Sequence, residues 1–171
     1  MKVLETYYRE RWFRSRLEAR YAVFFDALGE VWDYETEGYN LDDGDLYLPD
    51  FWLPRLEAFV EIKGSAPTGS EIRKCRKLQF YTENDVLICS GSPLENAVMW
   101  FSWEDTNGGL FTESAAQWIV TDSGLDMSEY ISEPDSFLRI AAIRAKRARF
   151  EFGETPSQEL ASIVDYNRIA F

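Results

Sequence analysis

Two apolar runs joined by a capped helical segment constrain the fold most. Residues 58–64 and 85–91 are short, apolar and typical of buried strands. Between them, Thr68 and Glu71 form a capping box ahead of a helical pattern over residues 70–81. A strand, a helix and a second strand in this order predict a right-handed parallel crossover, and therefore a sheet covered by helices.

The segments before this crossover predict one more helix and two more strands. Apolar side chains recur at helical spacing from about Trp12 to Leu28, and Gly29 is a natural stop. Residues 31–41 and 45–53 read as strands, and the Asp43-Gly44 pair between them suits a tight hairpin turn. The expected order over residues 12–90 is helix, three strands, helix, strand.

The C-terminal half gives weaker patterns. Residues 98–103 and 117–121 predict strands, with a turn at 107–109, and residues 134–136 open a helix that runs to about Phe150. A last short helix is expected within residues 157–171. We therefore expect a single α/β domain over residues 1–171, with a mixed sheet flanked by helices. Its parts are a core at about 11–90, a variable acidic insertion at about 91–133 and a basic helix at about 136–150.

The residue types limit the chemistry. The chain of 171 residues contains no histidine, which excludes Ser-His-Asp triads and imidazole metal ligands. Its two cysteines, Cys75 and Cys89, fit no zinc-site spacing and are expected to be buried free thiols. Any catalysis must rest on carboxylates, Lys, Tyr or a metal held by oxygen atoms.

The charge is unevenly distributed. The net charge is −12, but residues 78–138 contain eleven acids and no Lys or Arg, which leaves about −1 for the rest. Most basic residues fall in three clusters, at 9–20, 73–77 and 139–149. The protein can therefore present a basic face despite its acidic total.

The N-terminal sequence is too charged for a secretory signal, and no apolar run approaches the ~18 residues of a membrane span. We expect a soluble, cytoplasmic protein with no membrane partner.

Three charged side chains stand among the large apolar residues 48–64. Glu61 and Lys63 are two apart in a strand and share a face, opposite Val60 and Ile62. If the turn at residues 54–57 is symmetric, Asp50 lies directly across from Glu61, with Cβ atoms ~5 Å apart. Two carboxylates at that separation shift a pKa or need a cation between them.

A divalent cation satisfies this arrangement. Mg²⁺ prefers oxygen ligands and is often bound by one or two carboxylates plus a substrate phosphate. Asp50 and Glu61 supply the carboxylates, and the backbone carbonyl of Ile62 supplies a third oxygen. Lys63 would orient the attacking water and offset charge on the phosphate, which predicts phosphodiester hydrolysis. A turn-forming Asp50 and a solvated Glu61–Lys63 face are the structural alternatives.

Pro49-Asp50 followed by Glu61-Ile62-Lys63 resembles the signature of the PD-(D/E)XK nuclease superfamily, which has the restriction-endonuclease-like fold. The sequence around this signature is similar to that of small stand-alone nucleases encoded by bacteriophage genomes. The resemblance implies an α-β-β-β-α-β core, Mg²⁺ or Mn²⁺ as cofactor and DNA as substrate. It makes Asp50 and Glu61 metal ligands and Lys63 the catalytic lysine. Glu18 on the first helix is the matching candidate for a third carboxylate; a solvated residue paired with Arg14 or Arg20 is the alternative.

Other residues are candidates for DNA contacts or for a place near the metal. Gln79 follows the catalytic strand, where some members of this superfamily use a Gln or Lys; a plain surface residue fits equally well. The predicted phosphate contacts are Arg14, Arg73, Lys74, Lys77, Arg139, Arg144, Lys146, Arg147 and Arg149. A plain surface position is an equal alternative for Lys74 and Lys77, and a solvated face for the helix at 136–150.

A second class of function stays open. The acidic stretch 78–138, with Trp100, Trp103 and Trp118, would suit a non-catalytic interaction or inhibitor protein that binds a partner or mimics DNA. A homodimer also stays open, because nothing in the sequence marks a dimer surface. Substrate structure and sequence preference cannot be read from these residues.

Overall fold

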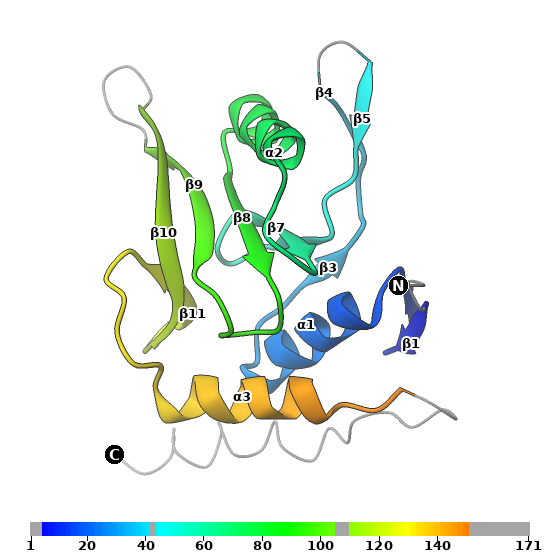
Figure 1. Cartoon of the computed structure of the whole chain (residues 1–171), viewed down its shortest axis with the longest axis vertical. Coiled ribbons are helices and arrows are strands. Elements are labelled where there is room, and N and C mark those ends of the chain that lie inside the picture. The colour runs from blue at the N-terminus through cyan, green and yellow to red at the C-terminus, as the bar shows by residue number, and fades with distance from the viewer. Residues whose placement is uncertain (1–4, 42–43, 105–109, 151–171) are drawn as a thin grey trace.

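A computed structural model describes residues 5–41, 44–104 and 110–150 (Figure 1). Its main element is a seven-stranded mixed sheet with the strand order β11-β10-β9-β8-β7-β6-β3. Helices α1 (Arg16–Ala27) and α3 (Ser136–Arg147) pack against each other on one face. Helix α2 (Gly69–Thr82) covers the other face (Figure 1). The expected α/β class with a mixed sheet and flanking helices is confirmed.

The central crossover forms as predicted. Strands β7 (Ala58–Lys63) and β8 (Asp85–Ser90) pair in parallel, and α2 connects them. The Thr68 hydroxyl accepts from the Glu71 backbone N–H, while the Glu71 carboxylate accepts from the Thr68 backbone N–H, so the capping box is complete.

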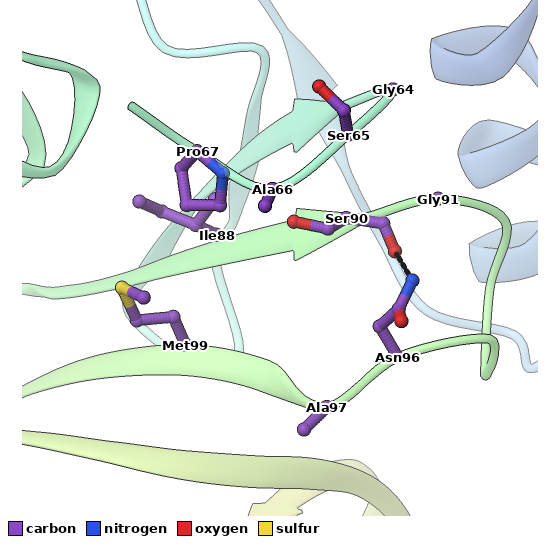
Figure 2. Close-up of a pocket in the computed structure, with 10 residues that line it drawn as sticks. All are labelled: Gly64, Ser65, Ala66, Pro67, Ile88, Ser90, Gly91, Asn96, Ala97 and Met99. Carbon is purple, nitrogen blue, oxygen red and sulfur yellow. Dashed lines mark hydrogen bonds between the residues drawn. The ribbon is translucent and has the colours of Figure 1, made fainter. Parts of the chain in front are cut away.

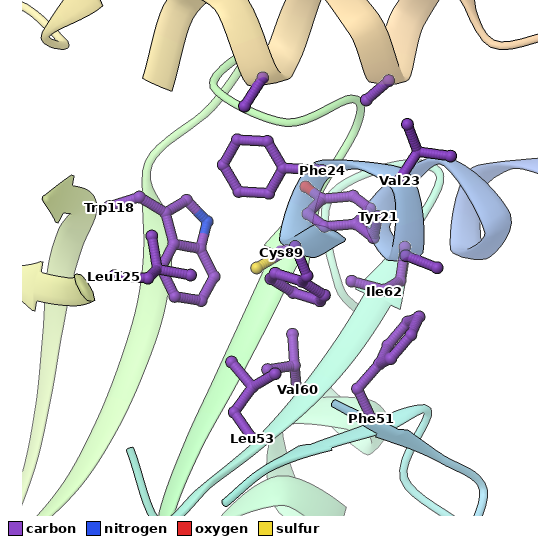
Figure 3. Packing of buried hydrophobic residues seen from close by; sticks show 14 of the residues in the cluster. Tyr21, Val23, Phe24, Phe51, Leu53, Val60, Ile62, Cys89, Trp118 and Leu125 are labelled. Carbon is purple, nitrogen blue, oxygen red and sulfur yellow. The ribbon is translucent and has the colours of Figure 1, made fainter. Parts of the chain in front are cut away.

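Side chains of β7 alternate between two cores. Val60 and Ile62 belong to the larger cluster, which also holds the apolar face of α1 and part of α3. Phe59 packs into the smaller cluster with Cys75 and Leu78 of α2. Figure 3 shows aromatic and aliphatic side chains from α1 and the sheet meeting in the larger cluster. Both cysteines are buried free thiols, as predicted.

The two strands expected over residues 31–53 are interrupted. Strands β3 (Asp33–Tyr34) and β6 (Phe51–Leu53) pair within the main sheet, whereas β4 (Tyr39–Leu41) and β5 (Asp45–Tyr47) form a separate two-stranded sheet. Four residues separate β3 from β4, whereas only three separate β5 from β6 on the opposite side of this hairpin. The side from β3 to β4 therefore carries one extra residue. Glu35 takes up this extra residue with φ 46°, and its backbone N–H donates to the Asp50 carbonyl at 3.0 Å. The Asp43-Gly44 turn is only partly within the described residues.

The first helix begins later than its periodicity suggests. Residues Arg11–Phe13 form strand β2, which pairs with β1 (Thr6–Tyr8) in a small antiparallel hairpin. The helix starts at Arg16 because the Ser15 hydroxyl accepts from the Glu18 backbone N–H and caps it. The prediction of a helix from Trp12 was therefore wrong by one turn.

Three antiparallel strands extend the sheet beyond β8. They are β9 (Val98–Glu104), β10 (Leu110–Thr121) and β11 (Gly124–Ser128), of which the sequence predicted only parts of the first two. The predicted turn at 107–109 and the last helix within 157–171 lie outside the described residues. Helix α3 is capped by Asp135 as expected, but ends at Arg147 rather than near Phe150.

None of the helices in the described part of the chain combines the length and apolar character needed to cross a membrane.

Candidate active site

The register of β6 and β7 brings Asp50 toward Glu61. Phe51 pairs with Val60 and Leu53 with Ala58, so the four-residue turn is closed symmetrically, as predicted. Asp50 directly precedes β6, and one further step in this register places it opposite Glu61. Both side chains are buried. The alternative of a solvated sheet face for Glu61 is therefore wrong.

Asp50 is held by two donors. Its Oδ2 accepts from the Ile62 backbone N–H at 2.7 Å, and its Oδ1 accepts from Nη2 of Arg14 at 2.5 Å. Burial raises the pKa of Asp50 well above its usual range, and the charges of Glu61 and Glu18 raise it further. The Ile62 N–H and the Arg14 charge oppose this shift. The charges of Glu61 and Glu18 therefore both act on Asp50.

Glu61 is held from two sides of its carboxylate. The Tyr47 hydroxyl donates to Oε2 at 2.7 Å, and Nζ of Lys63 lies 2.6 Å from Oε1. Burial raises the pKa of Tyr47 well above its usual range, so its hydroxyl stays protonated as a donor. Strand β5 thus orients a carboxylate of β7 across the site.

Lys63 is an ammonium in this arrangement. Its Nζ contacts Glu61 and also Oε1 of Glu71, at 3.1 Å, on the first turn of α2. Burial acts to lower the pKa of Lys63, but the hydrogen bonds and charges of the two glutamates outweigh it and raise the pKa. A charged Lys63 can donate to a water or a phosphate oxygen but cannot accept a proton.

Glu18 lies on the first turn of α1 and is buried. Its carboxylate accepts from the Ser15 hydroxyl at 2.7 Å and from the Tyr34 hydroxyl at 2.5 Å. It is therefore not the solvated helix residue that was the alternative at the sequence level. Its charge acts on Asp50, as a third carboxylate of one site would.

Carboxylate oxygens are the ligand type that a hard divalent cation prefers. In this site, however, the carboxylates are paired with positively charged side chains of the chain itself. Among the described residues, no group of three or more His, Cys, Asp and Glu side chains stands ready to hold a metal ion. Arg14 contacts Asp50, and Lys63 contacts Glu61, so each carboxylate already has a counter-ion. Asp50, Glu61 and Glu18 have the ligand chemistry of Mg²⁺ or Mn²⁺. An ion at Asp50 would compete with Arg14 for the same carboxylate. The predicted carbonyl ligand of Ile62 stays a prediction.

The predicted DNA-contacting residues do not form one surface. Arg14 lies in the site, where it also pairs with Glu35. The basic residues of α2 and those of α3 lie on opposite faces of the sheet (Figure 1). On α2, Arg73 is exposed and Lys74 and Lys77 are half-buried. On and after α3, the exposed predicted side chains are Arg139, Lys146, Arg147 and Arg149, and Arg144 is half-buried.

Two of the α3 side chains have acidic partners. Arg139 pairs with Glu133, and Lys146 lies 3.5 Å from Glu95. Burial lowers the pKa of Arg144. The α3 cluster is therefore partly neutralised by the acidic segment next to it.

Gln79 has a structural contact. It is buried, and its Nε2 donates to the Ser102 carbonyl of β9 at 2.5 Å. The alternative of a plain surface residue is wrong, since the side chain joins α2 to the sheet.

Sequence reasoning missed the two tyrosines and Glu35. Tyr34 lies on β3 of the main sheet and Tyr47 on β5 of the small sheet, and their hydroxyls donate to Glu18 and Glu61. Glu71 was identified as a capping residue, and its contact with Lys63 was not. The Ser15-x-x-Glu18 spacing was a readable signal for the true helix start.

A separate recess lies beside this site. It measures about 230 Å³ and lies where the loop after Lys63 passes the ends of β8 and β9 (Figure 2). Its lining includes Ser65, Ser90 and Asn96 but no acidic or basic side chain. The recess therefore does not contain the carboxylates or the lysine.

Comparison of the sequence with models of known protein families gives no match. None of the curated proteins matches it either. Function is therefore inferred from the residues of the site.

Proposed function

We propose that this protein is a metal-dependent deoxyribonuclease of the PD-(D/E)XK type, which hydrolyses phosphodiester bonds with Mg²⁺ or Mn²⁺. The observation that carries the proposal is the meeting of Asp50, Glu61 and Lys63 at one place on neighbouring chain segments. The order of α1, the strands up to β7, α2 and β8 also agrees with a restriction-endonuclease-like core.

Each residue has a distinct part in the proposed reaction. Asp50 and Glu61, with Glu18, would hold the ion, whose charge would polarise the phosphate and favour ionisation of a water. Tyr47 and the Ile62 N–H fix the two carboxylates. Lys63 donates to the attacking water or to a non-bridging phosphate oxygen, where charge develops.

Two arginines near the site could also bind an anionic substrate. The side chain of Arg14 is 55% exposed, so when released from Asp50 it could reach a phosphate in solvent. Arg73 is exposed on α2, two residues after Glu71, which contacts Lys63. These side chains would bind the backbone without reading its sequence.

Cleavage of plasmid DNA tests the proposal. Purified protein is incubated with supercoiled and linear DNA in Mg²⁺, in Mn²⁺ or in EDTA, beside Glu61→Gln and the surface control Asp122→Asn. Nicking that requires the metal, is lost in Glu61→Gln and survives in Asp122→Asn supports a nuclease. Equal cleavage in EDTA, or full activity of Glu61→Gln, contradicts it.

A second candidate is an interaction protein on the same scaffold. The pairing of both carboxylates with Arg14 and Lys63 is also what a purely structural ion network would show. Exposed acids such as Asp122, Glu129 and Glu133 would then form the binding surface. No cleavage under any metal condition, together with tight binding to a protein partner, would favour this candidate.

A further inference from the structure

The β1–β2 hairpin presents two aromatic side chains to solvent. Tyr7 and Trp12 are direct cross-strand partners, and their ring centroids lie 5.2 Å apart. Tyr7 is 46% exposed and Trp12 is 66% exposed. A large aromatic pair on an open face is a common mark of an interaction surface.

The opposite face of the hairpin already anchors it. Thr6, Tyr8 and Phe13 are buried, and the Tyr8 hydroxyl donates to Oδ2 of Asp26 at 2.7 Å. Phe13 packs against the ring of Tyr34 with centroids 4.4 Å apart. Tyr7 and Trp12 therefore point away from the core that holds the hairpin, and packing of that core does not explain them.

The hairpin turn is fixed to α1. Arg9 and Glu10 at the turn have φ values of 47° and 61°, which side-chain-bearing residues rarely adopt. An ion pair between Arg9 and Asp26 of α1 holds this turn. The aromatic pair is therefore presented on a fixed support.

The aromatic pair lies next to the candidate active site. Arg14, which contacts Asp50, is two residues after Trp12, and two residues of chain span at most about 7 Å. Figure 1 shows the hairpin beside the first turn of α1, the turn that carries Glu18. A strand held at Asp50 and Glu61 would pass within a few nucleotides of Trp12.

The charge around the pair suits a nucleic acid. Residues 5–20 contain five Arg and three Glu, a local charge of +2 in a chain of −12. The side chain of Arg11 is 46% exposed and lies 4.0 Å from Asp33, and that of Arg14 is 55% exposed and pairs with Glu35 and Asp50. Arginines beside an exposed aromatic platform are the combination that binds single strands, because phosphates meet the cations and bases stack on the rings.

We propose that Tyr7 and Trp12 stack an unpaired base of the DNA strand next to the scissile phosphate. This inference rests on the proposed function and deepens it: the preferred substrate has unpaired bases beside the cut, as in a flap or a frayed end. A fully paired duplex offers no free base face to Trp12 and binds through its phosphates alone.

Binding in EDTA, where no cleavage is expected, tests the inference. Fluorescence anisotropy compares three labelled DNAs of equal length: a full duplex, a duplex with a single-stranded flap, and the same flap built from abasic nucleotides. The wild-type protein should bind the normal flap about tenfold more tightly than the abasic flap. Trp12→Ala should lose this difference, and Trp12→Phe, which keeps an aromatic ring, should retain most of it.

The control is Tyr130→Ala, which removes an aromatic side chain that is 79% exposed beyond β11. It should keep the wild-type preference. Equal affinity of the wild-type protein for the normal and abasic flaps would overturn the inference, and so would an unchanged preference in a folded Trp12→Ala. Loss of self-association in Trp12→Ala, measured by light scattering, would overturn it too, by assigning the pair to a protein contact.

The failure of stacking and the failure of the nuclease proposal are distinguishable. If only stacking is wrong, Trp12→Ala and the wild-type protein still nick paired plasmid equally in Mg²⁺ and bind every flap alike. If the nuclease proposal is wrong, the wild-type protein itself shows no metal-dependent nicking.

Discussion

Nη2 of Arg14 lies 2.5 Å from Oδ1 of Asp50, although the two residues are 36 apart in the sequence. Lys63 has the same relation to Glu61, at 2.6 Å. Each of the two central carboxylates therefore has its own cation from the chain. If the proposed site holds a divalent ion, that ion would compete with Arg14 for Asp50, and its affinity would depend on a side chain that is not a ligand.

Arg14→Gln should strengthen metal binding in the absence of DNA. The change removes both a competitor for Asp50 and a nearby positive charge, an effect of about 1 kcal/mol or about fivefold. Isothermal titration with Mn²⁺ measures it. Arg147→Gln removes an exposed charge from α3 and should leave the affinity unchanged. Weaker Mn²⁺ binding by Arg14→Gln would show that Arg14 assists the site rather than competing with it.

Lys63→Met should lower the single-turnover cleavage rate by about 10²-fold or more, because a donor to the developing charge is lost. Mn²⁺ binding should not weaken, since the lysine is not a ligand and, like Arg14, is a cation that contacts a carboxylate of the site. Lys146→Met, which removes the exposed partner of Glu95, is the matched control and should cleave normally. Normal cleavage by Lys63→Met would remove the lysine from the mechanism.

Tyr47→Phe should weaken metal binding and destabilise the metal-free protein by about 1–3 kcal/mol, because Glu61 loses a buried donor. Urea denaturation and Mn²⁺ titration measure the two effects. The control is Tyr39→Phe. Tyr39 lies on β4 directly opposite Tyr47, and its hydroxyl contacts only Glu37, at 3.5 Å. A Tyr47→Phe protein that matches the Tyr39→Phe protein in both measurements would show that Tyr47 does not orient Glu61.

Glu71 gives a pH dependence of stability. The Thr68 backbone N–H and hydroxyl, with a smaller effect of Lys63, lower the pKa of Glu71 to about 2. Because the folded-state pKa is below the unfolded value of about 4.3, the stabilisation is present above that value and is lost as the pH falls toward 2. Glu71→Gln should therefore cost about 1 kcal/mol at pH 7, a cap-sized effect reduced by solvent screening, and less at pH 3.

Thermal unfolding of Glu71→Gln at several pH values measures this effect, and Glu129→Gln serves as an exposed control. A difference from the wild-type protein that stays constant from pH 7 to pH 3 would contradict the assignment.

The sequence predicted best where the signal was local. The crossover of β7, α2 and β8 was predicted from two apolar runs and a capping box. Each of these patterns spans only a few residues and specifies one type of secondary structure. The register of Asp50 and Glu61 followed from the length of the turn at 54–57. The start of α1 was misjudged because helical spacing was weighed without the Ser15 cap.

Long-range side-chain contacts could not be predicted. The hydroxyls of Tyr34 on β3 and Tyr47 on β5 donate to Glu18 and Glu61 from strands of two separate sheets. The contact of Arg14 with Asp50 joins a bend before α1 to the start of β6. Neither leaves a periodic pattern in the sequence, because each depends on the packing of distant segments.

The most direct test of the central claim is an anomalous difference map from crystals soaked in Mn²⁺. If Asp50 and Glu61 hold the ion, a peak lies between their carboxylates, about 2.1 Å from the oxygens, and Arg14 has moved away from Asp50. Crystals at saturating Mn²⁺ with no peak there, and with Arg14 and Lys63 still paired to the two carboxylates, would contradict it.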